Sequence, residues 1–150
     1  RGVVTVVDFF FSTCPTICID MATNKREIQS FFLEDNSKVQ ILSFTVDPET
    51  DTQEKLLQYA YDNNVNSNSW NLATGDKVSI YELARKSFMV TATEGDGGED
   101  DFIHDNKFVL IDREKRIRGY YDGTSHEDTE RLKQDIQKLL VSYIIPHKEK

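Results

Sequence analysis

Residues 3–18 read VVTVVDFFFSTCPTIC, and this stretch decides the fold. Val3 to Phe11 is a nearly continuous apolar run, rich in β-branched and aromatic residues. Such a run is typical of a strand that is buried on both faces of a sheet. Pro15, directly after Cys14, suits the first position of a helix, where no backbone donor is needed. The stretch therefore predicts a buried strand followed at once by a helix, with Cys14 at the junction.

Outward from this stretch, strands and helices alternate along the chain. Further strands are predicted over residues 39–46, 70–72, 107–112 and 116–121, and helices over residues 15–32, 52–64, 77–88 and 125–144. Asp51 is predicted to cap the second helix. The short turn after residue 112 makes the last two strands an antiparallel hairpin. In the first helix, the residues available for a buried side are Ile17, Met21, Ile28, Phe31 and Phe32.

The order of these elements is that of a thioredoxin-like α/β fold. Parallel strand–helix–strand units come first, and an antiparallel hairpin and a closing helix follow. We therefore expect a central mixed sheet flanked by helices. No repeat or linker-like segment divides the chain, so residues 1–150 are predicted to form a single domain. This fold keeps its active site where the first strand ends and a helix begins, which is the position of Cys14.

Composition excludes several classes of function. Hydrophobic residues make up 38% of the chain and charged residues 29%, which fits a soluble globular domain. The net charge of −8 argues against a nucleic-acid partner, because phosphate binding needs clustered lysine and arginine. No apolar run is long enough to span a membrane. Because Arg1 stands almost directly before the first strand, we expect the sequence to be the soluble part of a longer chain, whose membrane anchor or export signal lies outside it.

Cys14 and Cys18 are the only cysteines, and their spacing points to metal binding or redox chemistry. Residues four apart lie on one face of a helix, so the two sulfurs could converge on one ion or approach disulfide distance. A helix N-terminus also favours thiolates. Two thiolates with an imidazole suit Cu(I), whereas a structural zinc site usually has four ligands.

The third ligand of such a site must come from a distant part of the chain. Among the three histidines, His104 precedes the strand predicted at residues 107–112. In a thioredoxin-like fold, the loop before this strand sits beside the cysteine-bearing helix. His104 is therefore the predicted ligand, although its position alone fits a solvated loop residue as well. His126 and His147 are predicted to be surface residues.

Two segments resemble the Sco/SenC family. Residues 7–18, VDFFFSTCPTIC, are similar to its copper motif, and residues 44–52, FTVDPETDT, resemble its second signature, S-x-D-P-x-x-D-T. The resemblance extends over residues 4–145, and His104 falls where the family keeps its histidine ligand. It implies a copper chaperone that binds Cu(I), and often Cu(II), through Cys14, Cys18 and His104. Such proteins deliver copper to the copper-site subunit of cytochrome c oxidase, or another cuproprotein, or reduce the copper-site cysteines.

The resemblance also implies a compartment. Family members are commonly anchored in the bacterial inner membrane with this domain in the periplasm, or in the mitochondrial inner membrane with it in the intermembrane space. The chain departs from the family pattern in three places. Ile19 follows Cys18 where the family usually has proline, Ile103 precedes His104 where the family often has aspartate, and the family's N-terminal hairpin is missing. Asp105 is a candidate replacement for that aspartate.

Other functions would use the same residues. A thiol–disulfide oxidoreductase acting on a partner protein would use Cys14 and Cys18 as a redox-active pair and would need no histidine. A redox or copper sensor would share all three residues, and a structural disulfide is the simplest alternative to any of these functions. Asp51 fits either helix capping or a role in the site. The acidic loop at residues 94–101 fits a solvated loop better than a docking surface.

Overall fold

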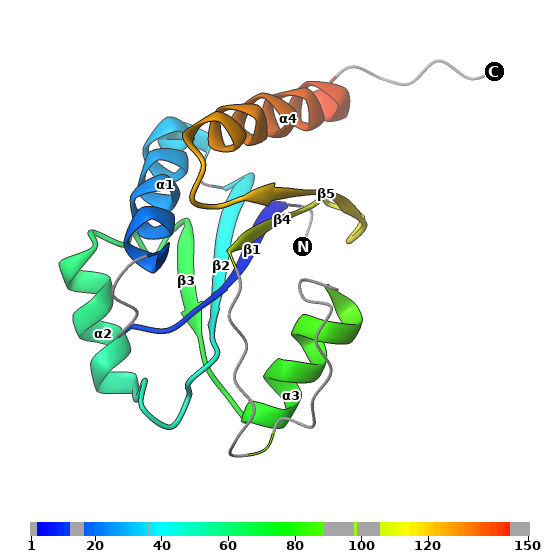
Figure 1. Ribbon diagram of the computed structural model, residues 1–150. Helices are drawn as coiled ribbons and strands as arrows, with labels where there is room; N and C mark the ends of the chain where they lie inside the picture. The colour runs from blue at the N-terminus through cyan, green and yellow to red at the C-terminus, as the bar shows by residue number, and fades with distance from the viewer. Residues whose placement is uncertain (1–2, 13–16, 36, 89–97, 99–105, 145–150) are drawn as a thin grey trace.

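The computed structural model describes residues 3–12, 17–35, 37–88, 98 and 106–144. These residues form a mixed sheet with strand order β3-β2-β1-β4-β5 (Figure 1). The central strand β1 (Val4–Phe10) runs parallel to β2 (Val39–Thr45), which in turn runs parallel to β3 (Trp70–Ala73). On its other side β1 is antiparallel to β4 (Lys107–Ile111), which pairs with β5 (Ile117–Asp122) as an antiparallel hairpin. The predicted mixed sheet is confirmed, with the apolar run at its centre.

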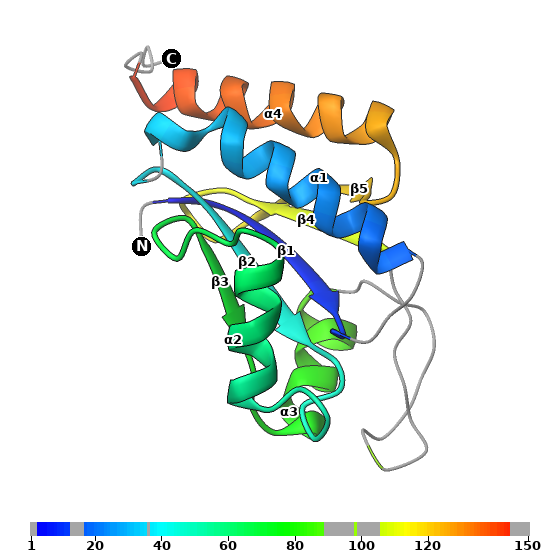
Figure 2. The same ribbon diagram turned by 90° about the vertical axis from the view of Figure 1, so that its left-hand side faces the viewer.

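Alternate residues of β1 face two separate hydrophobic clusters. Val4 and Val6 belong to the cluster beneath α1 (Ile17–Phe31) and α4 (His126–Ile144), which lie side by side over one face of the sheet (Figure 2). Val7 and Phe9 belong to the cluster on the opposite face, beneath α3 (Lys77–Glu82). This alternation explains why nearly the whole strand is apolar. The helices contribute Met21, Ile28, Leu132, Ile136 and Leu139 on the first face and Ile80, Tyr81 and Ala84 on the second.

The remaining helix, α2 (Gln53–Asp62), packs next to the end of β1. The ring of Tyr59 lies 5.0 Å from the ring of Phe10, and Arg26 of α1 donates a hydrogen bond to Asn63 just past the end of α2. Trp70, the first residue of β3, is fully buried in the cluster beneath α1. No helix in the described ranges is long and apolar enough to cross a membrane.

Two predicted details of the helices are wrong. Phe31 is 50% exposed, because Phe32 takes the buried position and adjacent helical residues do not share a face. The helix predicted over residues 77–88 ends as an α-helix at Glu82 and continues as a π-helical segment, Leu83–Ser87. There the N–H of Phe88 donates to the carbonyl of Leu83, five residues back, at 2.9 Å. A short 3₁₀ turn, Leu33–Asp35, follows α1 and was not predicted.

A buried ion pair joins β1 to α1. Lys25 Nζ lies 2.7 Å from Asp8 Oδ2, and the two side chains are 1% and 0% exposed. Ser43 on β2 donates to Asp8 Oδ1 at 2.5 Å and accepts from Lys25 Nζ at 3.2 Å and from Trp70 Nε1 at 3.1 Å. The Lys25 ammonium also lies 5.0 Å from the centre of the Phe10 ring. The charge of Asp8 is therefore balanced by that of Lys25, and Ser43 hydrogen-bonds to both, within an otherwise apolar layer.

The turn between β4 and β5 is organised around the buried carboxylate of Asp112. Its Oδ1 accepts from the N–H groups of Glu114 and Arg116, and its Oδ2 lies 3.0 Å from Arg118 Nη1. Burial acts to raise the pKa of Asp112, but these hydrogen bonds and the neighbouring guanidinium groups outweigh it, and the net pKa is lowered. The carboxylate form is thus favoured by folding.

A pH dependence of stability follows from this lowered pKa. A group whose pKa is depressed in the folded state stabilises the protein above its unfolded-state pKa, near 3.9, and loses that contribution as the pH falls through its folded-state pKa. We expect Asp112→Asn to be less stable than wild type at pH 5, by about 1 to 3 kcal/mol. The difference should shrink as the pH approaches about 2. Urea denaturation at both pH values checks this, and a difference independent of pH would contradict it.

Candidate metal centre

The predicted ligands fall largely outside the described residues. Cys14, His104, Ile103 and Asp105 lie in segments that the structure does not describe. Cys18 lies in the first turn of α1, but its side chain is likewise not described. The structure does describe the residues that flank these segments, and they define where the segments join the sheet.

Asp51 accepts hydrogen bonds from Ser12, which lies two positions before Cys14. Its carboxylate is 1% exposed. Oδ2 accepts a hydrogen bond from the backbone N–H of Ser12 at 3.0 Å and another from Thr45 Oγ1 at 2.6 Å, and Oδ1 accepts from Ser12 Oγ. The segment that leads to Cys14 is therefore tied to the end of β2 through three hydrogen bonds to one carboxylate.

The prediction that Asp51 caps α2 is wrong. Thr52 is the N-cap, and its Oγ1 accepts from the N–H of Lys55 at 3.3 Å. The carboxylate of Asp51 points instead to the end of β1, because a buried carboxylate needs several donors and Ser12 and Thr45 supply them. Of the two roles that the sequence left open for Asp51, capping of α2 is excluded, and a role in the site stays a prediction.

The sheet topology brings the flanks of the predicted ligands to one edge. Phe10, the last residue of β1, pairs with Thr45, the last residue of β2. Strand β4 runs the opposite way, with Val109 opposite Val7, so it begins at the edge where β1 ends. Asn106, two residues after His104, thus lies directly before β4 at the edge where Ser12, two residues before Cys14, follows β1. This juxtaposition follows from pairing a parallel unit with an antiparallel hairpin.

The backbone of Gly123 forms hydrogen bonds both to α1 and to the residue before β4. Its N–H donates to the carbonyl of Asn106 at 2.6 Å, and its own carbonyl accepts from Asn24 Nδ2 at 2.7 Å. Asn24 is a buried residue of α1, and Asn106 stands two positions after His104. The helix whose first turn contains Cys18 and the strand that follows His104 are therefore anchored on the same glycine.

This anchor predicts a strong preference for glycine at position 123. A Cβ added there would lie 2.8 Å from Cε1 of Phe108 and 3.0 Å from the carbonyl oxygen of Asn106. Because the Phe108 ring is fully buried, we expect Gly123→Ala to lower the free energy of unfolding by about 1 to 3 kcal/mol. Gly75→Ala is the matched control, since nothing lies within 4 Å of its added Cβ. Urea denaturation that found the two variants equally stable would contradict the prediction.

The sequence analysis missed several residues around the candidate site. Asn24 and Gly123 belong to no motif, and only the three-dimensional structure joins them. Away from this site, a group formed by Glu27, His126 and Glu130 on α1 and α4 was missed as well, although the i, i+4 spacing of the last two was a usable signal. His126 was predicted to be a surface residue, and its side chain is 74% exposed, which confirms that part.

Comparison with known proteins identifies the family. A family model described as SCO1/SenC matches residues 1–141 of the chain. The chain belongs to the SCO1/SenC family. Its Sco relatives include a SCO1 protein homolog of Bacillus subtilis, which is 31% identical over 138 residues, covering 91% of this chain and 71% of the relative. The resemblance seen in residues 7–18 and 44–52 is thereby confirmed.

Solved Sco structures share the fold. A SCO1/SenC family lipoprotein from Bacillus anthracis superposes with a TM-score of 0.79 at 30% identity, covering 93% of this chain and 83% of that one. BsSco, described with a disulfide switch as a member of the Sco family of cytochrome c oxidase assembly proteins, has a TM-score of 0.77 at 29% identity, covering 94% and 82%. Yeast Sco1 with copper bound, at 23% identity and a TM-score of 0.72, covers 99% and 83% and shows the fold alone.

Proposed function

We propose that this Sco protein binds copper through the sulfurs of Cys14 and Cys18 and an imidazole nitrogen of His104. The observation that carries the proposal is the common sheet edge, where β1 and β2 end and β4 begins. The described residues that flank the proposed ligands support it, since Ser12 before Cys14 and Asn106 after His104 lie at this edge, although His104 is far from the cysteines in sequence. Two thiolates and one imidazole form a soft donor set that suits Cu(I). Membership of the SCO1/SenC family supports the same assignment.

The bound copper would be cargo. We propose that the chain delivers it to the copper-site subunit of cytochrome c oxidase, or to another cuproprotein, as the description of BsSco suggests. Ser12, tied to Asp51, and Asn106, tied to Gly123, would hold the two ligand segments close to their binding positions before the ion arrives. Such preorganisation lowers the conformational entropy lost on binding. The proposed location is the bacterial periplasm, anchored at the inner membrane as a lipoprotein relative suggests, with the mitochondrial intermembrane space as the alternative.

The second candidate function is thiol–disulfide exchange, which the disulfide switch described for BsSco favours. Cys14 and Cys18 would pass from dithiol to disulfide while a disulfide of the partner protein becomes a dithiol, with two electrons and two protons transferred. The partner could be the copper-site protein itself, whose cysteines must be reduced before copper can bind. This function requires both cysteines but not His104.

An anaerobic titration of the fully reduced protein with Cu(I), in competition with a calibrated chelator, tests the proposal. Wild type should bind one equivalent, Cys14→Ser and Cys18→Ser should lose this binding, and His104→Ala should weaken it strongly. His147→Ala is the matched control and should bind as wild type does. Absence of Cu(I) binding by wild type would overturn the proposal. In that case, reduction of a partner disulfide by metal-free protein, retained in His104→Ala, would support the exchange function.

A further inference from the structure

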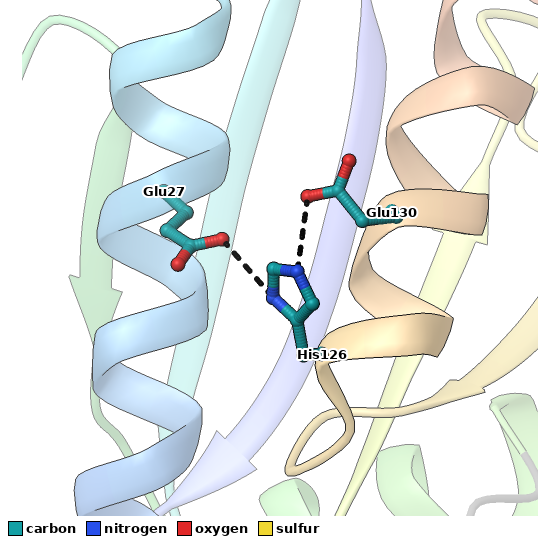
Figure 3. Close-up of side chains that lie close together, drawn as sticks. All are labelled: Glu27, His126 and Glu130. Carbon is teal, nitrogen blue, oxygen red and sulfur yellow. Dashed lines mark ion pairs between the residues drawn. The ribbon is translucent and has the colours of Figure 1, made fainter.

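Three potential metal ligands converge on the outer side of α1 and α4, on a surface separate from the edge described above. Figure 3 shows the imidazole of His126, the first residue of α4, between the carboxylates of Glu27 on α1 and Glu130 one turn further along α4. His126 Nδ1 lies 4.0 Å from Glu27 Oε1, and His126 Nε2 lies 4.0 Å from Glu130 Oε2. One ligand atom from each residue lies within 4.8 Å of the other two.

One oxygen of this group lacks a hydrogen-bond donor. Glu27 Oε1 is buried, yet it accepts no hydrogen bond from any residue that the structure describes. Its nearest cationic group is the ammonium of Lys133, at 3.6 Å, beyond normal hydrogen-bond length. A buried carboxylate oxygen without a donor is costly, and coordination to a cation would remove that cost. This oxygen faces the imidazole of His126, toward the centre of the group.

The group has more carboxylates than ammonium groups, so its charge favours binding of an additional cation. Lys133 Nζ lies 2.9 Å from Glu130 Oε2 and 3.6 Å from Glu27 Oε1. The Lys133 side chain is only 12% exposed and its ammonium also lies 5.1 Å from the centre of the Phe31 ring, which holds it in place. Two carboxylates therefore share one ammonium, so Lys133 balances only one of the two acidic side chains.

We propose that Glu27, His126 and Glu130 bind a divalent transition-metal ion of the Zn²⁺ type, which would link α1 to α4. An imidazole nitrogen and two carboxylate oxygens are common Zn²⁺ ligands, and water would complete the coordination. Ligand distances of about 2.0 to 2.2 Å place neighbouring atoms of a tetrahedral site roughly 3.3 Å apart. The 4.0 Å separations would have to shrink by about 0.7 Å, and a separation at the 4.8 Å limit by about 1.5 Å, through rotation of these partly exposed side chains. Without a thiolate, the group does not suit Cu(I).

Lys133 makes the proposal sharply testable, because its ammonium competes with the metal ion for both carboxylates. Removing a ligand should therefore lower the affinity for Zn²⁺, and removing Lys133 should raise it. Even at the dielectric constant of water, the loss of one unit charge about 4 Å from the ion is equivalent to roughly a fivefold change in affinity, and the Lys133 charge, on a side chain only 12% exposed, is screened less than that. A general effect of mutating this surface would instead weaken binding in both variants.

The experiment is a calorimetric titration with ZnCl₂ in a Cys14→Ser/Cys18→Ser background, which removes the thiolates. Zn²⁺ should bind the background protein, and adding His126→Gln or Glu27→Gln should weaken binding at least tenfold. Adding Lys133→Gln should tighten it by at least about fivefold. His147→Gln is the matched histidine control and should leave the affinity unchanged. Thermal unfolding of each variant, with and without Zn²⁺, confirms that all of them fold and that bound metal raises Tm.

Two results would overturn the proposal. One is a Zn²⁺ affinity that His126→Gln leaves unchanged, and the other is an affinity that Lys133→Gln fails to increase. The site does not depend on the copper function, because the background protein has no cysteine and Zn²⁺ is the probe. Failure of Cu(I) binding in wild type and failure of Zn²⁺ binding here are therefore separate outcomes.

Discussion

Lys25→Met is expected to lower the free energy of unfolding by about 3 to 5 kcal/mol. The substitution leaves the carboxylate of Asp8, which is fully buried, without its counter-charge at 2.7 Å. Ser43 would remain as a donor to Asp8, but one hydroxyl compensates little of the cost of burying an ionised carboxylate. The cation–π interactions of the ammonium with the rings of Phe10 and Trp70 would be lost as well. Urea denaturation at pH 7 measures the effect.

Two further variants separate the cause from a general loss of packing. Asp8→Asn/Lys25→Met removes both charges and keeps an amide beside Ser43, so it should recover much of the lost stability. Lys86→Met removes a lysine from an exposed pair with Glu82 and should change stability by no more than about 1 kcal/mol. If Lys25→Met were as stable as wild type, Asp8 would have to be uncharged or solvated in the folded protein.

Asp51→Ala is expected to cost about 2 to 5 kcal/mol of stability. It would leave the half-buried N–H of Ser12 and the fully buried hydroxyl of Thr45 without their acceptor, and a buried donor without a partner costs about 1 to 3 kcal/mol. Asp51→Asn keeps one oxygen acceptor and should cost less. Glu49→Ala, at an exposed position in the same segment, is the control and should stay within about 0.5 kcal/mol of wild type.

The same Asp51 variants test the proposed copper site. Because Ser12 stands two residues before Cys14, its release should weaken Cu(I) binding while both thiols remain present. The competition titration is performed where the variant is still fully folded, so that an affinity change is not a loss of folded protein. An unchanged Cu(I) affinity in a clearly destabilised Asp51→Ala would show that the carboxylate supports the fold without positioning Cys14.

Elements with strong local patterns could be predicted from the sequence. The run from Val3 to Phe11 has few alternatives to a buried strand, and the spacing of Leu132, Ile136 and Leu139 along α4 leads to the buried face that the structure shows. Phe31 was misassigned because two adjacent phenylalanines at the end of a helix are equally apolar. Which of them is buried depends on where α1 meets the sheet and α4, and this is a tertiary property.

The candidate site was predictable only as a set of residue types. Cys14 and Cys18 are recognisable because they are close in sequence, and the S-x-D-P-x-x-D-T signature drew attention to Asp51. The partner of Asp51 was not predictable, since capping of α2 satisfies the local sequence as well as a bond to Ser12 does. The contact between Asn24 and Gly123 spans most of the chain, so no local pattern encodes it.

The antiparallel pairing of β4 with β1 has a consequence for the order of events during synthesis. The cysteine segment leaves the ribosome about 90 residues before β4, which at 5 to 20 residues per second is a delay of roughly 5 to 20 seconds. Until then, the nascent chain has both cysteines but lacks His104 and lacks β4, the strand that pairs with the second side of β1. An oxidant or metal ion that reached the nascent chain in this interval would encounter the two thiols before His104 has been added. A chain of this topology would benefit from remaining reduced until its last third has been translated.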